Sequence, residues 1–243
     1  MGKHIAIWPL VILLSTSGGC SAADAIDGED SEDDVAPSDD VDMGTSTAAL
    51  SAPQTIYVDF TGPMITSCAN PCSDAVTNHS YIVHYAWGTS SKNFAAYTDS
   101  AGRSAIVSHL RTIFSKYDVT ITTTRPASGP YTTVVITPTT WAHHGIAPLD
   151  CGNANKSDIA FVLHTGDTGF YTSYAKIAQA AAHELGHSFG LAHVKNTADV
   201  MEWASSGTSF AEGYYDNAHP SGKCISGTFQ ADGKLLTANI GLK

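Results

Sequence analysis

The residues best suited to chemistry lie in one short stretch, residues 183–193, which reads His-Glu-Leu-Gly-His-Ser-Phe-Gly-Leu-Ala-His. Histidines four positions apart lie one turn apart on the same face of a helix, where both imidazoles can bind a single metal ion. His183 and His187 form such a pair. The spacing therefore predicts a zinc site on a helix.

A third histidine follows a residue that can end this helix. Gly190 permits backbone conformations closed to other residues, so the chain can turn and bring His193 back to the metal. Three neutral nitrogen ligands leave a coordination position open for water. We expect Glu184, next to the first ligand, to act on that zinc-activated water as general base and then as general acid.

The helix that positions these residues is predicted to span residues 174–190. Ala180 falls on the metal-binding side, where its small side chain leaves room for a cleft. The opposite side is apolar and is expected to pack against a sheet. It consists of Ala178, Ala181, Ala182, Leu185 and Phe189.

The long motif resembles that of the metzincin clan of zinc metallopeptidases. Met201 lies eight residues after His193, where matrixin-like members of the clan, bacterial ones included, place a methionine turn beneath the metal. The resemblance covers most of residues 55–203. It implies an endopeptidase with one catalytic zinc ion and a protein or peptide substrate.

The chain departs from the subfamilies of the clan just after Met201. Glu202 and Trp203 stand where matrixins usually have a small motif containing proline. Trp203 also stands where astacin-like and serralysin-like members have a tyrosine, so we expect no tyrosine ligand. The subfamily stays open.

We expect an α+β (mixed α/β) fold with two main helices. Alternating or β-branched runs predict strands, and spaced apolar residues predict a helix over residues 101–117 in addition to the motif helix. The resemblance implies a twisted, mostly parallel sheet with an antiparallel edge strand that aligns the substrate, and a small irregular C-terminal subdomain. The catalytic domain is thus expected over residues 55–243, with an upper part at about 55–193 and a lower part at about 194–243. The expected strands cover residues 55–60, 119–124, 131–136 and 158–163.

The N-terminus has the layout of an export signal. Lys3 precedes an apolar run over residues 5–14, and small residues come just before Cys20. This resembles the lipobox of bacterial lipoproteins, which predicts a signal peptide over residues 1–19, a lipid on Cys20 and a place in the bacterial cell envelope. The alternative is a plain secretory signal, cut near Ala22 or Ala23, and a secreted protein.

Residues 20–54 are predicted to form a disordered acidic tether. Residues 21–54 contain ten Asp or Glu and no Lys or Arg, so they carry −10 of the formal net charge of −11. With few large apolar residues they bury too little surface to offset the entropy of ordering. An inhibitory pro-segment is the alternative. The nearly neutral remainder excludes a basic nucleic-acid binder, and we expect contact with a membrane only through a lipid anchor.

The five cysteines become an even set once Cys20 is set aside. In an oxidising compartment the other four can form two disulfides. Of three pairings we favour Cys68–Cys72, a tight loop, and Cys151–Cys224, which would tie the middle of the chain to its C-terminal part.

Two further clusters of candidate ligands precede the motif helix. His143 and His144 lie where the resemblance places the edge strand, and they either bind a metal or are simply exposed. The second cluster has the spacing of a calcium loop without its glycine and terminal glutamate, so the alternative to Ca²⁺ is a solvated loop. It consists of Asp150, Asn153, Asn155 and Asp158.

Two other functions fit parts of the pattern. One is a non-catalytic, zinc-stabilised binding module of the envelope, although a structural zinc site typically has a fourth protein ligand and no use for Glu184. The other is a zinc hydrolase of non-peptide amides, against which only the resemblance argues. We expect a monomer, with Trp203, Tyr214 and Tyr215 either lining a specificity pocket or packing together.

Overall fold

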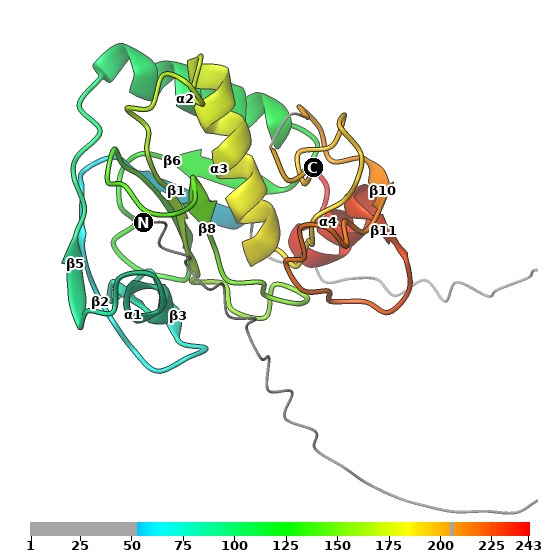
Figure 1. The fold of residues 1–243 in the computed structure, drawn as a ribbon, viewed down its shortest axis with the longest axis horizontal. Helices are drawn as coiled ribbons and strands as arrows, with labels where there is room; N and C mark the ends of the chain where they lie inside the picture. Colours follow the sequence, from blue (N-terminus) through cyan, green and yellow to red (C-terminus); the bar gives the residue numbers. More distant parts are fainter. Residues whose placement is uncertain (1–52, 205–206) are drawn as a thin grey trace, which may run out of the picture. The chain divides into compact units, whose positions relative to one another are not determined.

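A computed structural model describes residues 53–204 and 207–243 of the chain (Figure 1). The expectations about the export signal, Cys20 and the acidic tether concern residues that lie outside this part, except that Gln54 belongs to the first strand. Among the described residues, no helix combines the length and the apolar character needed to cross a membrane.

A five-stranded sheet with the order β6-β1-β7-β9-β8 lies at the centre of the fold. The first four strands are parallel, and the edge strand β8 runs antiparallel to β9, with Gly145 opposite Val162. Every residue of β7 and β9 is buried, as expected for parallel strands covered on both faces. The expectation of a mixed α/β fold with a mostly parallel sheet is confirmed. The strands are β1 (Gln54–Asp59), β6 (Val119–Thr122), β7 (Thr132–Ile136), β8 (Gly145–Ile146) and β9 (Ile159–Val162).

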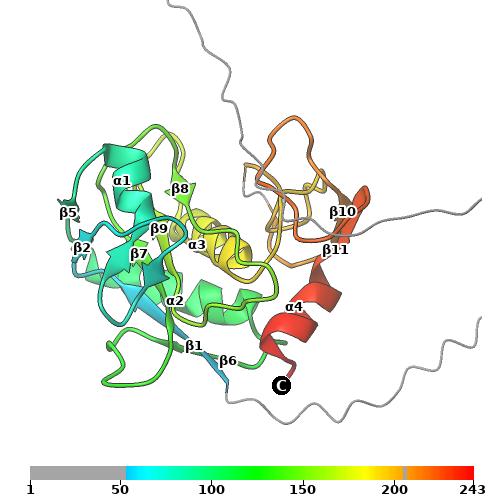
Figure 2. The same cartoon turned by 90° about the horizontal axis from the view of Figure 1, so that it is seen from below.

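Two long helices, α2 (Ser100–Ile113) and α3 (Tyr174–Ser188), pack together on one face of the sheet (Figure 2). They are the two main helices that the sequence predicts, and each ends a few residues earlier than expected. In α3 the reason is local, because Gly190 has a left-handed φ of 90° and cannot extend the helix. The predicted apolar stripe of α3 is buried in this core, but so is Ala180, which was expected to border a cleft.

The opposite face of the sheet is covered by residues 64–93, for which no elements were predicted. Strands of two or three residues form a second sheet with the order β3-β4-β2-β5, and the disulfide Cys68–Cys72 closes the loop between β2 and β3. A short helix packs beside it, and its residues Ile82 and Val83 share a core with Phe161 of β9. These elements are β2 (Met64–Thr66), β3 (Ser73–Asp74), β4 (His79–Ser80), α1 (Tyr81–Trp87) and β5 (Ser91–Asn93).

The C-terminal part is more regular than the irregular subdomain expected. It contains an antiparallel ribbon of β10 (Glu212–Tyr214) and β11 (Phe229–Ala231), followed by α4 (Asp232–Ile240). Leu236 and Ile240 of α4 belong to the same core as α2 and α3. Such short elements carry too few periodic positions to be recognised in the sequence.

Candidate metal centre

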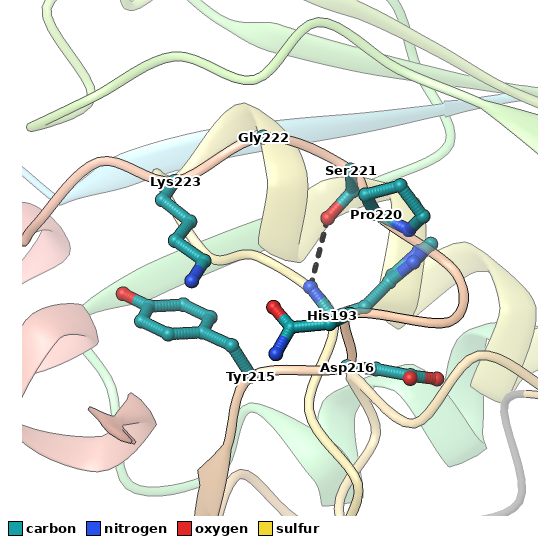
Figure 3. Close-up of a pocket in the computed structure, with 8 residues that line it drawn as sticks. His193, Tyr215, Asp216, Pro220, Ser221, Gly222 and Lys223 are labelled. Carbon is teal, nitrogen blue, oxygen red and sulfur yellow. Dashed lines mark hydrogen bonds between the residues drawn. The ribbon is translucent and has the colours of Figure 1, made fainter. Parts of the chain in front are cut away.

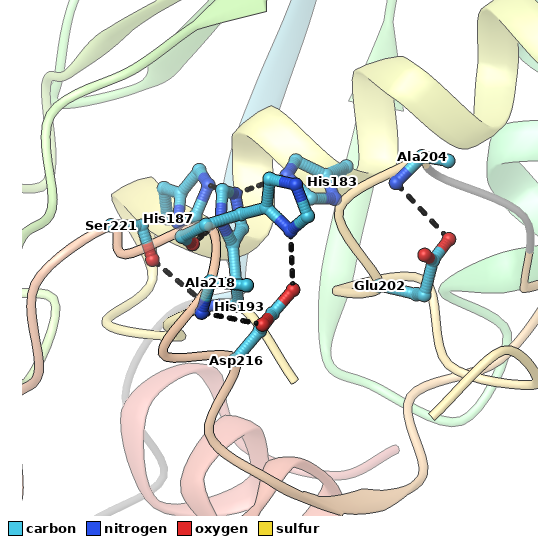
Figure 4. Close-up of polar contacts among 9 residues, drawn as sticks. His183, His187, His193, Glu202, Ala204, Asp216, Ala218 and Ser221 are labelled. Atoms are coloured by element: carbon cyan, nitrogen blue, oxygen red, sulfur yellow. Dashed lines mark hydrogen bonds and ion pairs between the residues drawn. The ribbon is translucent and has the colours of Figure 1, made fainter. Parts of the chain in front are cut away.

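Three histidine side chains meet at the C-terminal end of α3 (Figure 4). His183 and His187 lie one turn apart on the helix, and His193 returns to them after the turn at Gly190. The Nε2 atom of His193 lies 3.0 Å from Nε2 of His183 and 3.1 Å from Nε2 of His187. The structure thus brings together the three residues that the motif predicts as ligands.

The Nε2 atoms face one another, and the Nδ1 atom of each imidazole forms a hydrogen bond with a backbone carbonyl group. The Nδ1 atoms of His183 and His187 donate to the backbone carbonyls of Val200 at 2.8 Å and Leu191 at 2.7 Å. That of His193 donates to the carbonyl of His219 at 2.7 Å. A carbonyl can only accept, so the proton of each neutral ring is on Nδ1 and its lone pair is on Nε2.

This arrangement fits a zinc ion. Three Nε2 lone pairs face one another without a proton to share, which is unfavourable unless a cation lies between them. Zinc bonds of about 2.0–2.1 Å to imidazole nitrogen are compatible with Nε2 atoms 3.0–3.1 Å apart. Hydrogen bonds from Nδ1 to carbonyl groups are also the usual support of zinc-binding histidines.

Burial keeps these imidazoles in the neutral form that binds metal. His183 and His187 are 4% and 6% exposed. Burial, followed by the charge of His193, lowers the pKa of His183 to about 3. Burial also lowers the pKa of His187 and of His193. All three imidazoles are therefore neutral at neutral pH, each with a single proton on Nδ1.

The side chain of Glu184 extends from α3 to the edge strand β8. Its side chain is 8% exposed, and its carboxylate packs against the backbone of Gly145 in β8. A Cβ atom on Gly145 would lie only 2.1 Å from Oε1 of Glu184. Burial raises the pKa of Glu184 to about 8 in the protein without a cation, and a nearby Zn²⁺ favours the charged form instead.

Met201 lies in a turn that packs under α3. It is fully buried, and its sulfur is so close to Gly186 that a Cβ there would lie 2.3 Å from Sδ. Asp199 fixes this turn, since its carboxylate accepts from the N–H groups of Met201 and Ala211, both at 2.6 Å. The same turn supplies the carbonyl of Val200 to His183.

The loop over residues 216–224 holds His193 from the other side. Ser221 Oγ accepts from the His193 N–H at 2.8 Å, and the His193 carbonyl accepts from the N–H of Asp216 at 3.0 Å. His219 lies in this loop with Nδ1 2.7 Å from the Asp216 carboxylate, and its ring stacks on Trp203 at 4.0 Å. These loop residues were missed because their contacts to His193 involve single hydroxyl or backbone groups without a sequence pattern.

A small pocket opens beside His193 and is lined by Tyr215, Asp216, Ser221 and Lys223 among others (Figure 3). Of the three aromatic residues expected near the site, Tyr215 lines this pocket. Trp203 contacts His219, and Tyr214 is exposed and packs against Phe229.

The candidate calcium residues bond mainly to one another and to the backbone. Asp150 accepts from the Asn155 N–H at 2.8 Å, and the Asn155 amide donates to Asp158 at 2.7 Å. The amide of Asn153 donates to the carbonyl of Asn239 at 3.1 Å. These contacts account for the conformation of the loop, and calcium binding there stays a prediction.

The disulfides are Cys68–Cys72 and Cys151–Cys224, the pairing that the sequence favours. Cys224 ends the loop that holds His193, and Cys151 lies in the segment that precedes β9. The second disulfide therefore ties the loop that holds His193 to the segment between β8 and β9.

Comparison with known proteins places a metallopeptidase signature over this region. Residues 81–194, from α1 to just after His193, match the model of the reprolysin-like metallopeptidase family M12B. A comparison with curated proteins finds no significant match. Among solved structures, archaemetzincin from Methanopyrus kandleri aligns with 67% of this chain and 92% of its own, at 12% identity and a TM-score of 0.35. The family match and the three-histidine group together support a zinc hydrolase of the metzincin type.

Proposed function

We propose that this protein is a zinc-dependent endopeptidase. The observation that carries the proposal is the set of three Nε2 atoms, 3.0–3.1 Å apart along its two measured edges, whose Nδ1 protons are all committed to carbonyl groups. Buried Glu184 lies on the same helix, next to the first ligand. The match of residues 81–194 to a metallopeptidase family favours peptide substrates.

His183, His187 and His193 would hold the ion, which as a Lewis acid polarises the scissile carbonyl and makes water acidic. Glu184 then accepts a proton from the attacking water and passes it to the leaving amine. Its surroundings suit this task, because burial raises the pKa of the carboxyl group while a nearby Zn²⁺ lowers it, so the group can both take and return a proton.

The edge strand offers a place for the substrate. Within the described residues, β8 pairs with β9 on one side, and the backbone groups of its other side are left for an extended peptide. Gly145 in this strand touches Glu184, so a peptide added along β8 would pass close to the catalytic carboxylate. We assign Met201 the supporting role of a methionine turn, on the strength of its packing under Gly186.

The ligand group argues against a purely structural zinc site. Among the described residues it consists of three histidines, whereas a structural site typically has four protein ligands. A purely structural site also gives no reason for a carboxylate to be buried beside it. A hydrolase of non-peptide amides would need the same centre and is separated by its substrates.

The test is cleavage of a mixed peptide library by the full chain loaded with zinc, with products identified by mass spectrometry. We expect cleavage at internal peptide bonds that stops with a zinc chelator and returns when zinc is added in excess. Hydrolysis of small N-acyl amides without any peptide cleavage would favour the non-peptide hydrolase. Bound zinc with neither activity would favour the binding module.

A further inference from the structure

A cleft of about 380 Å³ opens where two parallel strands of the main sheet end beside α2, and it shares no residue with the candidate metal centre. Phe60 and Thr61 directly follow β1, and Thr123 directly follows β6. In open α/β sheets, ligands bind outside the carboxyl ends of the strands, so the cleft lies where a ligand is expected. The helix α2 supplies its other lining residues, which are Arg103, Ser104, Val107 and Arg111.

The guanidinium of Arg103 is fixed in this cleft. Its Nε–H donates to the carbonyl of Tyr97 at 2.7 Å, and the group lies over the Phe60 ring, 5.6 Å from the ring centre. Both terminal nitrogens are left without a partner among the described residues. Such a planar pair of N–H donors matches the two oxygens of a carboxylate or phosphate group.

Arg111 supplies a second guanidinium to the same cleft. It lies eight positions after Arg103 in α2, about 12 Å further along the helix axis. One of its terminal nitrogens donates to the carbonyl of Ile121 in β6 at 3.1 Å, which holds the side chain against the sheet. The chain has three arginines, so two of them line this one cleft.

No carboxylate neutralises these two charges within the described part of the chain. Neither arginine forms an ion pair there. The nearby Asp59 accepts from the N–H and hydroxyl groups of Thr61, both at 2.7 Å. Asp99 accepts from the N–H of Gly102 at 3.0 Å and from the hydroxyl of Tyr174 at 2.8 Å. Both carboxylates are thus bound by neutral donors, and the guanidinium groups are left for another anion.

A structural role explains only part of this arrangement. Each arginine donates to one backbone carbonyl, which accounts for a single N–H group of each guanidinium. It gives no reason for two cations to open into one cleft without an acidic partner. An anion uses both, because guanidinium groups have N–H donors to spare and no acceptor.

We propose that Arg103 and Arg111 together bind a small ligand whose oxyanion groups carry two negative charges. One phosphate group, or two carboxylates on a short carbon chain, supplies that charge. Phe60 and Val107 are buried side chains in the lining of the cleft, and they offer apolar contact to the rest of the ligand. The cleft volume of about 380 Å³ falls within the range of small-molecule sites.

The experiment is isothermal titration calorimetry of the full chain loaded with zinc, in chloride buffer at neutral pH. Inorganic phosphate and glutarate, a dicarboxylate, are titrated separately at equal ionic strength. We expect saturable binding of at least one of them, with a dissociation constant in the millimolar range or below. Binding of phosphate alone would assign the site to a single dianionic group, and binding of glutarate alone would assign it to two separate carboxylates.

Three variants test the cleft itself. Arg103→Gln and Arg111→Gln each remove one guanidinium, and we expect each to weaken binding at least about tenfold, because charge-assisted hydrogen bonds are lost. Ser104→Glu retains both arginines but adds a carboxylate at an exposed position of the cleft lining, where it competes with the ligand. We expect a similar loss of binding in this variant.

Thr112→Glu is the matched control for net charge, because it makes the corresponding change at an exposed position of α2 that does not line the cleft. It is expected to bind the anion like the unaltered chain. Absence of saturable binding of either anion to the unaltered chain would overturn the proposal. Undiminished binding in the three cleft variants, or an equal loss in Thr112→Glu, would do the same. Peptidase activity does not enter these titrations, so the anion site and the proposed function can fail separately.

Discussion

Proton positions define the candidate centre at the scale of single residues. The Nδ1–H groups of His183, His187 and His193 donate to carbonyl groups, and the three remaining lone pairs converge on one point. Glu184 adds a carboxylate whose pKa is raised by burial and whose position is limited by Gly145. Backbone carbonyl groups therefore determine which nitrogen of each histidine can bind the metal, and the backbone of Gly145 limits where the Glu184 carboxylate can lie.

Gly145→Ala tests whether the contact between β8 and Glu184 matters. The new Cβ would lie 2.1 Å from Oε1, so either the carboxylate or the edge strand must shift. A displacement of this size at a catalytic group costs on the order of 100-fold in rate, and we expect such a loss in kcat/KM for a peptide substrate. Gly166→Ala is the control, because its nearest neighbour atom would be 4.0 Å away. Unchanged kcat/KM in Gly145→Ala would show that this contact does not position Glu184.

The sequence predicts the ligand residues because helical spacing and a terminating glycine are visible in it. It does not predict the carbonyl partners, since every residue has a carbonyl group and the choice of Val200, Leu191 and His219 depends on the folded path of the chain. The cleft that contains Arg103 and Arg111 is equally hidden, because the pairing of β1 with β6 brings the ends of these strands together beside α2.

At the scale of elements, the centre is assembled from α3, the turn at Met201 and the loop over residues 216–224. Long periodic segments such as α2 and α3 are predicted from the sequence because their apolar positions repeat over several turns. Strands of two or three residues, such as β3 and β8, show no alternation to read. Such strands form because tertiary contacts hold the two segments side by side, so they can be recognised only in the structure.

The disulfide Cys151–Cys224 is expected to support the loop that holds His193. Cys151→Ser with Cys224→Ser opens a 73-residue separation, for which the loop-entropy model gives a loss of about 4 kcal/mol in the free energy of unfolding. The matched pair Cys68→Ser with Cys72→Ser opens a separation of only 4 residues, and the same model gives about 2 kcal/mol. Urea unfolding at saturating zinc measures both.

Zinc affinity shows whether the loss of a disulfide disturbs the loop that holds His193 or only lowers the stability of the whole chain. The loss of Cys151–Cys224 is expected to weaken zinc binding, because the loop that it anchors accepts the Nδ1 proton of His193. The loss of Cys68–Cys72 is expected to leave zinc affinity unchanged. Equal zinc affinity in both double variants would contradict a supporting role for the longer disulfide.

At the scale of the whole molecule, the described residues include a buried acidic pair, formed by Asp199 in the turn before Met201 and Asp232 at the start of α4. Asp199 and Asp232 are both fully buried, and each carboxyl group affects the pKa of the other. Burial and the charge of Asp199 raise the pKa of Asp232 to about 9. The pair therefore holds a proton at neutral pH, because two buried carboxylates in contact cannot both be charged without a large cost.

This pair predicts a pH dependence of stability. The folded chain retains a proton that the unfolded chain releases near the ordinary aspartate pKa, so stability falls as pH rises towards the raised pKa, by at most about 1.4 kcal/mol per pH unit. Asp232→Asn removes the ionisable group. We expect its stability to rise relative to the unaltered chain between pH 5 and pH 8, in urea unfolding at saturating zinc. Parallel stability curves would contradict the shared proton.

The sequence also carries a prediction about where the molecule resides. The apolar run over residues 5–14 and the odd cysteine count lead us to propose that residues 1–19 are removed and that Cys20 carries a lipid. Mass spectrometry of the mature N-terminal peptide is expected to show a lipid-modified Cys20. An unmodified N-terminus at a later residue would mean plain secretion, and the acidic residues 21–54 would then need a role other than a tether.

The most direct test of the central claim compares zinc content and peptide cleavage in Glu184→Gln. The change removes the proton acceptor and leaves His183, His187 and His193 intact, so we predict unchanged zinc content and a loss of at least about 100-fold in kcat. Glu212→Gln, the same change at an exposed position of β10, is expected to retain full activity. Turnover near that of the unaltered chain in Glu184→Gln, with zinc still bound, would contradict the assignment of Glu184 as the proton-transferring residue of a zinc peptidase.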